Sequence, residues 1–497
     1  MNQNNISAAE LFLRVRELLI LPELEPKTRN KMMHDTLILC CHEGVKDTKQ
    51  AFGNLFSQVD YLCKAHGIKV ADKIAIQTMR RHSNSQEPLS SEDLKYDARA
   101  LAIFISAVFG VDVPHELNVL IPHTNRPYQK GLEINNRRIR CIVKNWDSDF
   151  IRVDIDQDAD EEEYLVQLKD EENHIDHTYL WDILKEGMQL NLLDCQVKQP
   201  VITPRLIVVE PDYLVDISSI ATCFTAFGHH PLLYLLNQMK PRANTQATLL
   251  GNFAGAALDD IINTNGKYQM NETIKTNFRE KALEFCTCPW FDAKKFYTDA
   301  NQQAFNLQQV VDILFPRTAS QAQMSAFRGE SLYDRKKAIL EPSFVCEALG
   351  IQGRVDLMTT DCKLLVEQKS GRNMNIETHQ VDPGYHSYQL EPHYVQLLLY
   401  YGVLQHNFKL SNDRVNIRLL YSKYQPQDGL MVVAYYHKLF QEAIEYRNQL
   451  VAASFEIAKE GFEHALNEFT PDVLNVAGTQ DFFYNKYLKP QIEAITS

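Results

Sequence analysis

Hydrophobic positions in the first quarter of the chain recur at intervals of three and four residues. Residues 7–24 and 91–111 both show this spacing, and Ser and Glu stand at plausible N-terminal caps. The polar segment 80–93 between them has the composition of a loop. The pattern predicts a helical N-terminal region over residues 1–125.

Beyond about residue 130 the apolar residues alternate with polar ones, which is typical of half-buried strands. Several strands with one intervening helix predict a small, OB-like β-barrel over residues 126–204. Such a barrel would suit single-stranded nucleic acid, and a spacer barrel without a ligand is an equally good interpretation. Strands are expected over 137–155, 162–170, 188–197 and 205–211, with a short helix over 178–187.

The acidic stretch Asp154–Glu163 invites comparison with a calcium-binding loop. Its sixth position is Ala159 where glycine is needed, and its twelfth is Leu165 where a bidentate glutamate is needed. We therefore interpret it as a solvated acidic turn.

From residue 205 to 497 the pattern mixes helical and strand periods, which predicts an α/β domain and makes the whole chain an α+β multidomain protein. Two strands joined by a turn are expected over 353–370, followed by a helix, a strand and a long helix. Helices are predicted over 215–239, 248–263, 278–315, 393–405 and 438–462, and a strand over 416–424.

Composition changes this picture little. The 497 residues suit two to four domains, and 45% hydrophobic with 23% charged residues is ordinary for a globular protein. No apolar run could span a bilayer and no secretory signal opens the chain, so we expect no membrane partner and a cytoplasmic location. The ten cysteines lack zinc-site spacing. A net charge of -13 argues against non-specific duplex binding through bulk charge but permits a local basic groove.

The predicted hairpin over 353–370 places three charged residues in apolar strands. Glu367 and Lys369 share a strand face, and Asp356 on the neighbouring strand can reach the same patch. Two facing carboxylates would repel each other, so either one is protonated or a cation lies between them, and oxygen ligands favour Mg²⁺ or Mn²⁺. A lysine beside the metal would orient a water or steady charge on a phosphate, which suits phosphodiester hydrolysis. The alternative is an ordinary Glu–Lys surface pair.

The chain resembles the RecB-like PD-(D/E)XK nuclease family in three motifs. Gly353–Asp356 matches G-x-x-D, Glu367–Lys369 matches D/E-x-K, and a helix with Gln396 and Tyr400 matches Q-x-x-x-Y. The resemblance implies a restriction-endonuclease-like α/β core over 205–497, with Asp356 and Glu367 as ligands of Mg²⁺ or Mn²⁺ and Lys369 as the catalytic lysine. Gln396 and Tyr400 would support the site or contact DNA.

The resemblance extends to the nuclease regions of helicase–nucleases that trim Okazaki-fragment flaps. Residues 206–224, 248–261 and 339–356 are similar, with Glu341 at a matching acidic position, and so is the pair Arg447–Asn448. The resemblance implies that Glu341 and Arg354 bind DNA or support the site. Such proteins carry a barrel before the nuclease and a superfamily-one helicase after it. A phosphate-loop motif is lacking here, so this chain is not expected to be the motor itself. The resemblance implies single-stranded or flap DNA, and a helicase in cis or trans, as partners.

Two departures from that pattern matter. Many relatives hold an iron–sulfur cluster on four cysteines, but here the early position is Ala226 and no cysteine follows Cys362, so no cluster is expected. Relatives also carry a metal-binding histidine where this chain has Gly255, and Asp259 is the weaker candidate to replace it. His229 and His230, expected in another helix, are interpreted as structural.

Three functions are therefore weighed. The first is a metal-dependent DNA nuclease of replication or repair. The second is a DNA-binding or helicase-associated scaffold without turnover. The third is a nuclease of recombination or phage defence, which fold and motif do not separate from the first.

Overall fold

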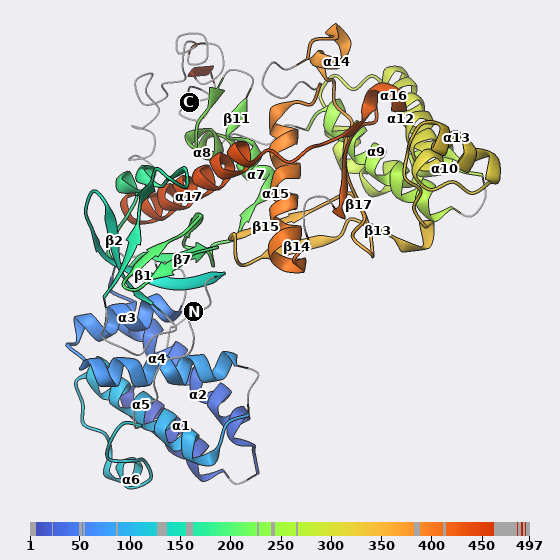
Figure 1. Cartoon of the computed structure of the whole chain (residues 1–497). Helices are drawn as coiled ribbons and strands as arrows, with labels where there is room; N and C mark the ends of the chain where they lie inside the picture. Colours follow the sequence, from blue (N-terminus) through green and yellow to red (C-terminus); the bar gives the residue numbers. More distant parts are fainter. Residues whose placement is uncertain are drawn as a thin grey trace. The chain divides into compact units, whose positions relative to one another are not determined.

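The computed structural model (Figure 1) divides into two compact units, Met1–Tyr213 with Ser454–Gly461, and Leu214–Ala453 with Phe462–Ser497. Each unit mixes helices and strands, so the expected α and β content is confirmed at this coarse level. No helix in the part of the chain described is long and apolar enough to cross a membrane. The structure describes residues 6–461, except 22, 49–51, 53–54, 86–87, 127–136, 156–162, 226–227, 240–243, 265–266, 382–387 and 411–413, and residues 485, 489–490 and 493.

The first unit opens with helices, as the apolar spacing predicts. Ser7 and Ser90 begin two of them through capping boxes with Glu10 and Asp93, which satisfy backbone N–H groups that the helix leaves free. Their apolar faces enclose one core. The helices are α1 (Ala8–Ile20), α2 (Pro26–Val45), α3 (Leu55–Ala65), α4 (Val70–Asn84), α5 (Ser91–Phe109) and α6 (His115–Asn118).

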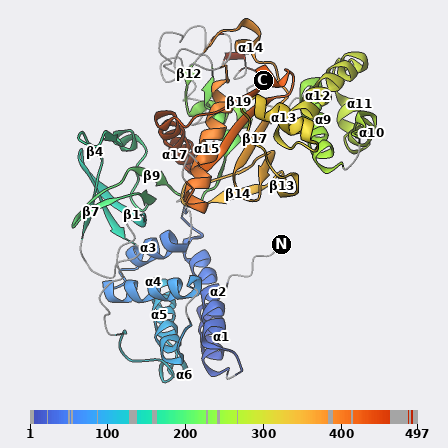
Figure 2. The same cartoon turned by 45° about the vertical axis from the view of Figure 1, so that its right-hand side comes forward.

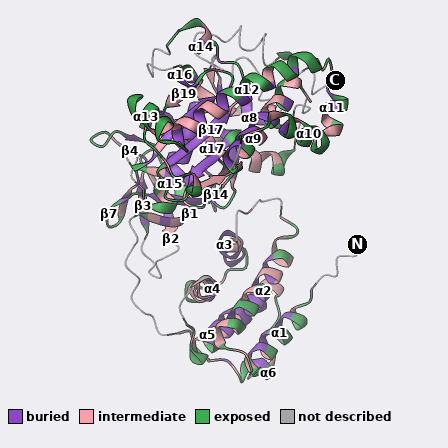
Figure 3. Cartoon of the chain, turned by 90° about the vertical axis from the view of Figure 1, so that its right-hand side faces the viewer, coloured by how far each residue is buried: buried purple, intermediate pink, exposed green. Residues whose placement is uncertain are grey.

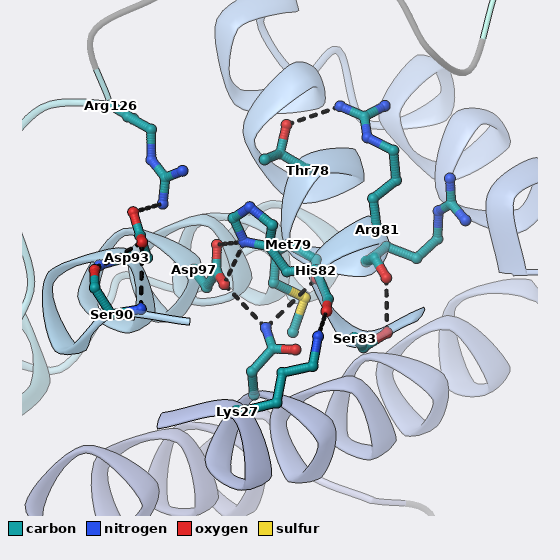
Figure 4. A network of polar contacts seen from close by, with 12 residues as sticks. Lys27, Thr78, Met79, Arg81, His82, Ser83, Ser90, Asp93, Asp97 and Arg126 are labelled. Carbon is teal, nitrogen blue, oxygen red and sulfur yellow. Dashed lines mark hydrogen bonds and ion pairs between the residues drawn. The ribbon is translucent and has the colours of Figure 1, made fainter. Parts of the chain in front are cut away.

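A buried polar network joins three of these helices (Figure 4). The Asp97 carboxylate of α5 lies 2.8 Å from His82 Nδ1 of α4 and accepts a hydrogen bond from Asn30 Nδ2 of α2 at 2.9 Å. Lys27 of α2 donates to the His82 carbonyl. The loop expected over 80–93 is therefore partly wrong, because α4 continues to Asn84 and these contacts hold its last turn.

The strands expected after residue 137 are present, but the closed barrel is wrong. Seven strands form one sheet in the order β7-β8-β3-β2-β1-β6-β9, and the described residues contain no closed barrel. The helix expected over 178–187 is a short 3₁₀ turn, Thr178–Asp182. Most of the acidic stretch lies outside the described residues. The strands are β1 (Arg138–Trp146), β2 (Phe150–Ile155), β3 (Tyr164–Gln167), β6 (Gln189–Leu193), β7 (Gln196–Lys198), β8 (Val201–Thr203) and β9 (Leu206–Val209), with a separate pair β4 (Lys169–Asp170) and β5 (Ile175–Asp176).

The second unit is built on a five-stranded sheet in the order β13-β16-β17-β18-β19. The strands β17 and β18 run parallel at its centre, and the helix between them in sequence, α15 (Glu391–Phe408), carries the chain back. The strands are β13 (Ala338–Leu340), β16 (Leu357–Thr359), β17 (Leu364–Lys369), β18 (Asn416–Tyr421) and β19 (Leu430–Val432).

Helices cover both faces of this sheet. Val366 and Leu420 pack into a core with α9 (Gln246–Asn263) and α12 (Ala293–Leu314), while the next residue of β18, Tyr421, turns to α15 and bonds His393. Figures 1 and 2 show α9 grouped with the other helices of this layer, and Figure 3 shows β17 as buried. The remaining helices are α10 (Met270–Glu280), α11 (Ala282–Thr287), α13 (Ala319–Phe327), α14 (Met374–Thr378), α16 (Pro426–Gly429) and α17 (His437–Glu460).

The single helix expected over 215–239 is wrong, because it is interrupted in its middle. Only its ends are helical, as α7 (Ile217–Ala221) and α8 (Leu232–Met239), and between them lies a hairpin of β11 (Phe224–Thr225) and β12 (Gly228–His229). His229 thus lies in a strand. Its Nε2 is 2.6 Å from Glu391 and its Nδ1 is 2.8 Å from Glu442. Burial opposes the charge, but these two carboxylates raise the pKa of His229 to about 9.

Candidate active site

The expected hairpin is present, but its first strand is broken. The returning strand β17 pairs antiparallel with β16, with Leu357 opposite Val366. The preceding residues Ile351–Arg354 form β15 in another sheet, between β10 (Val215–Asp216) and β14 (Ser343–Cys346). Asp356 lies in the gap between β15 and β16. Asp356 therefore belongs to neither strand.

The Asp356 carboxylate is fixed by the backbone of the neighbouring strand. Its Oδ2 accepts the Gln368 N–H at 2.6 Å, and its backbone carbonyl accepts the Glu341 N–H at 3.0 Å. Burial raises the pKa of Asp356, and Glu341 raises it further, although the Gln368 hydrogen bond and Lys369 oppose this.

Glu367 and Lys369 lie on one face of β17, as their spacing predicts. Lys369 Nζ donates to Glu367 Oε1 at 2.8 Å, and the glutamate side chain is almost fully buried. The other oxygen, Oε2, is buried and has no hydrogen-bond partner among the residues that the structure describes. Burial and the nearby Asp356 raise the pKa of Glu367 to about 7, although Lys369 opposes them. The three charges of the hairpin therefore form one interacting group.

A cavity of about 600 Å³ opens beside this group. It lies between α9, the end of α10 and the C-terminal end of β17, and it exposes Asp356 and Lys369 while Glu367 stays behind its lining. Its charged lining residues are the acidic Asp259, Glu280, Glu341 and Asp356 and the basic Lys281, Arg354 and Lys369. Both signs of charge thus meet in one pocket, which suits a cation and a phosphate together.

Helix α9 brings Gly255 and Asp259 to the cavity from one face, since they are four residues apart. A Cβ at Gly255 would meet no atom within 4 Å, so the helix presents open space there. Burial raises the pKa of Asp259 to about 6, with help from Glu341 and Asp356. The structure therefore places Asp259, expected as a weaker metal ligand, in the same cavity as Asp356, where the two carboxylates interact electrostatically.

Glu341 and Arg354 lie across the cavity from α9. Arg354 Nη1 is 3.2 Å from Glu341 Oε2, and both side chains are largely exposed. Glu341 has a φ of 49°, in the left-handed region that non-glycine residues seldom occupy. Such a backbone conformation costs about 1 kcal/mol or more, and strain of this kind gathers at functional sites.

The two helix residues expected to support the site do not line the cavity. Tyr400 Oη donates to the Arg354 carbonyl at 2.7 Å and thereby holds the end of β15. A Cβ at Gly353 would lie 3.1 Å from the same hydroxyl and 3.0 Å from Ile217, so glycine avoids a tight contact there. Gln396 is buried with Oε1 unpaired. Tyr400 is thus a positioning residue.

Sequence reasoning missed His393, which lines the cavity from the first turn of α15. Its Nδ1 lies 2.9 Å from Tyr421 Oη. Burial, helped by Lys369, lowers the pKa of His393 to about 3, so the imidazole is neutral. Its position three residues before Gln396 was the available signal, but a single histidine in an apolar helix is more often structural.

The residues fit a hard divalent cation. Carboxylates of Asp259, Glu341 and Asp356 line the cavity, and Glu367 keeps one buried oxygen unpaired. Among the described residues, no three His, Cys, Asp or Glu side chains are grouped closely enough to hold a metal ion. The early cysteine position of the iron–sulfur pattern, Ala226, lies outside the described residues.

Comparison of the sequence with family models gives no match, and neither does comparison with curated proteins. The family resemblance therefore depends on the motif residues and on their geometry.

Proposed function

We propose that the chain is a metal-dependent DNA nuclease of the PD-(D/E)XK type, with a restriction-endonuclease-like core in its second unit. The observation that carries the proposal is the grouping of Asp356, Glu367 and Lys369 at the edge of a cavity that also holds Asp259 and Arg354. Buried carboxylates with raised pKa values beside a lysine are typical of catalytic sites.

Each residue has a distinct role in this proposal. Asp356 and Glu367 would hold Mg²⁺ or Mn²⁺, with Asp259 or Glu341 completing the ligands. A bound cation would acidify its water and polarise the phosphate. Lys369, kept in place by Glu367 Oε1, would donate a hydrogen bond to the attacking water or to a phosphate oxygen.

Substrate and context follow from the same resemblance. We propose single-stranded or flap DNA as the substrate, in replication or repair, with a superfamily-one helicase as partner. A role in recombination or phage defence would use the same chemistry.

The test is cleavage of labelled single-stranded and flap DNA in Mg²⁺ or Mn²⁺. Lys369→Ala and Glu367→Gln should each lower the rate by roughly 10²-fold or more, the size usual for loss of one electrostatic contact to the transition state. Lys363→Ala is the matched control, because Lys363 is an exposed lysine in the turn of the same hairpin. Wild-type rates in both site variants would refute the assignment.

A second candidate is a DNA-binding scaffold without turnover, favoured by the open space at Gly255 on the helix that faces Asp356. DNA binding by the wild type, with no cleavage in either metal, would select it.

A further inference from the structure

Trp290 is the most exposed large hydrophobic residue among those described, with 98% of its surface accessible. It has a φ of 56°, in the left-handed region, which is unusual for a bulky residue. The loop that carries it is nevertheless anchored, since the Asp292 N–H donates to Gln246 Oε1 at 2.8 Å and Asp292 caps α12. The backbone beside Trp290 is thus held in place, while the indole ring itself is exposed to solvent.

The support of this loop is a cluster of phenylalanines. Phe285 lies at ring-centroid distances of 5.4 Å from Phe291 and 5.3 Å from Phe296, and these two are 5.4 Å apart. Such edge-to-face and tilted packing fixes the rings against one another. Trp290 directly precedes Phe291 and therefore extends from the cluster.

Two more exposed aromatic side chains flank the same cluster. Phe278, 49% exposed, packs on Phe285 at 5.0 Å, and Tyr297, 51% exposed, follows Phe296. Phe278, which packs on this cluster, and Trp290 and Tyr297, which are sequence neighbours of its members Phe291 and Phe296, are together called the aromatic platform below. Leu283, also exposed, lies in α11 between them in sequence.

Helix α10 links the platform to the cavity of the candidate active site. Phe278 lies on α10 between Asn277 and Glu280, which both line the cavity with Lys281. Residues 278–297 hold four basic and three acidic side chains, in a chain with a net charge of -13. The segment that carries the platform therefore has a small positive net charge, in contrast to the acidic chain as a whole.

We propose that the aromatic platform binds unpaired bases of single-stranded DNA by stacking, while the phosphates lead towards Lys281 and Arg354 in the cavity. This inference rests on the proposed function and specifies its substrate as a single strand. Stacking needs flat aromatic rings held in place beside a phosphate-binding surface, and the anchored Trp290 supplies this. Bases in a duplex already stack on one another, so they cannot stack on these rings.

Tryptophan fluorescence tests the stacking directly. The chain has three tryptophans, so the Trp146→Phe/Trp181→Phe variant leaves Trp290 as the reporter. In EDTA, a 20-mer of thymidine nucleotides should quench the emission, and an abasic 20-mer of equal charge should not. Equal quenching by both oligonucleotides, or none by the thymidine 20-mer at saturation, overturns the proposal.

Substitution gives the energetic test. Trp290→Ala should raise the Kd for the thymidine 20-mer about tenfold or more, since stacking of one base corresponds to roughly 5- to 150-fold. Trp290→Phe should retain most of the affinity, and Trp181→Ala, which removes the other exposed tryptophan, should leave it unchanged. An unchanged Kd in Trp290→Ala overturns the proposal. The platform would then be interpreted as a binding surface for a protein partner.

The two proposals fail in different ways. Quenching and a Trp290-dependent Kd without cleavage would refute the nuclease and keep the platform. Cleavage with an unchanged KM in Trp290→Ala would keep the nuclease and refute the platform.

Discussion

Glu367 combines deep burial with a carboxylate whose second oxygen has no partner. The fold raises its pKa to about 7 from an ordinary value of 4.5, so the folded state holds the proton more tightly than the unfolded state does. Without metal, the free energy of unfolding should therefore fall as the pH rises from about 4.5 to 7. Burial makes the charged form of Glu367 unfavourable, and a bound cation would offset that cost.

Glu367→Gln removes that ionisation and should make the metal-free protein more stable at pH 8. We expect a gain of about 1–3 kcal/mol, less than the full pKa shift implies because Lys369 loses its charged partner. At pH 4 the two proteins should be equally stable. Urea unfolding in EDTA at both pH values measures this, and an equal loss of stability at both would contradict it.

Within the elements, replacing two helical glycines by alanine should change the free energy of unfolding in opposite directions. Gly402 of α15 is closely packed, because a Cβ there would lie 2.6 Å from Phe440 and 2.9 Å from Leu349. Gly402→Ala should lower the free energy of unfolding by about 1–3 kcal/mol through overpacking. Gly255→Ala, on α9 with open space, should raise it by about 0.5–1 kcal/mol through helix propensity.

Thermal or urea unfolding of the two alanine variants, side by side, tests the packing of both helices. The same sign of change in both would show that one of these helix surfaces is misplaced.

The sequence predicted the helices over 248–263, 393–405 and 438–462 and the β16–β17 turn, because local periodicity determines them, but the helix expected over 278–315 is divided among α10, α11 and α12. It did not predict the break before Asp356, since β15 pairs with β10 more than 130 residues away. The hairpin within 215–239 was not predicted, because helix and strand are hard to distinguish in a continuous apolar sequence. Alternation likewise predicted strands over 137–211, but it carries no information on whether a sheet closes.

The site shows the same division between local and distant information. The motif Glu367–Lys369 could be predicted because two residues on one strand face are close by geometry alone. That α9 and α10 would bring Asp259 and Lys281 to the same cavity depends on helix packing, which spacing does not encode. His393 was missed for this reason.

Taken as a whole, the molecule is acidic, and the cavity proposed to bind phosphates has few basic side chains. The net charge is -13, while the cavity offers Lys281, Arg354 and Lys369. Affinity for single-stranded DNA should therefore depend weakly on salt, because few counterions are released. A slope of log Kobs against log[KCl] of about -2 is expected, from about 0.7 per neutralised phosphate and roughly three contacts.

Lys281→Ala should reduce that slope by about 0.7 and weaken binding without changing preference among sequences, since a phosphate contact carries no base information. Lys363→Ala, in the turn at the far end of β17, should leave the slope unchanged. Titration of a labelled thymidine 20-mer between 50 and 300 mM KCl in EDTA measures both. A wild-type slope steeper than about -4 would mean that many more cations bind the strand than this cavity holds. Binding would then extend far over an acidic surface, and the path from the aromatic platform to Lys281 would not explain it.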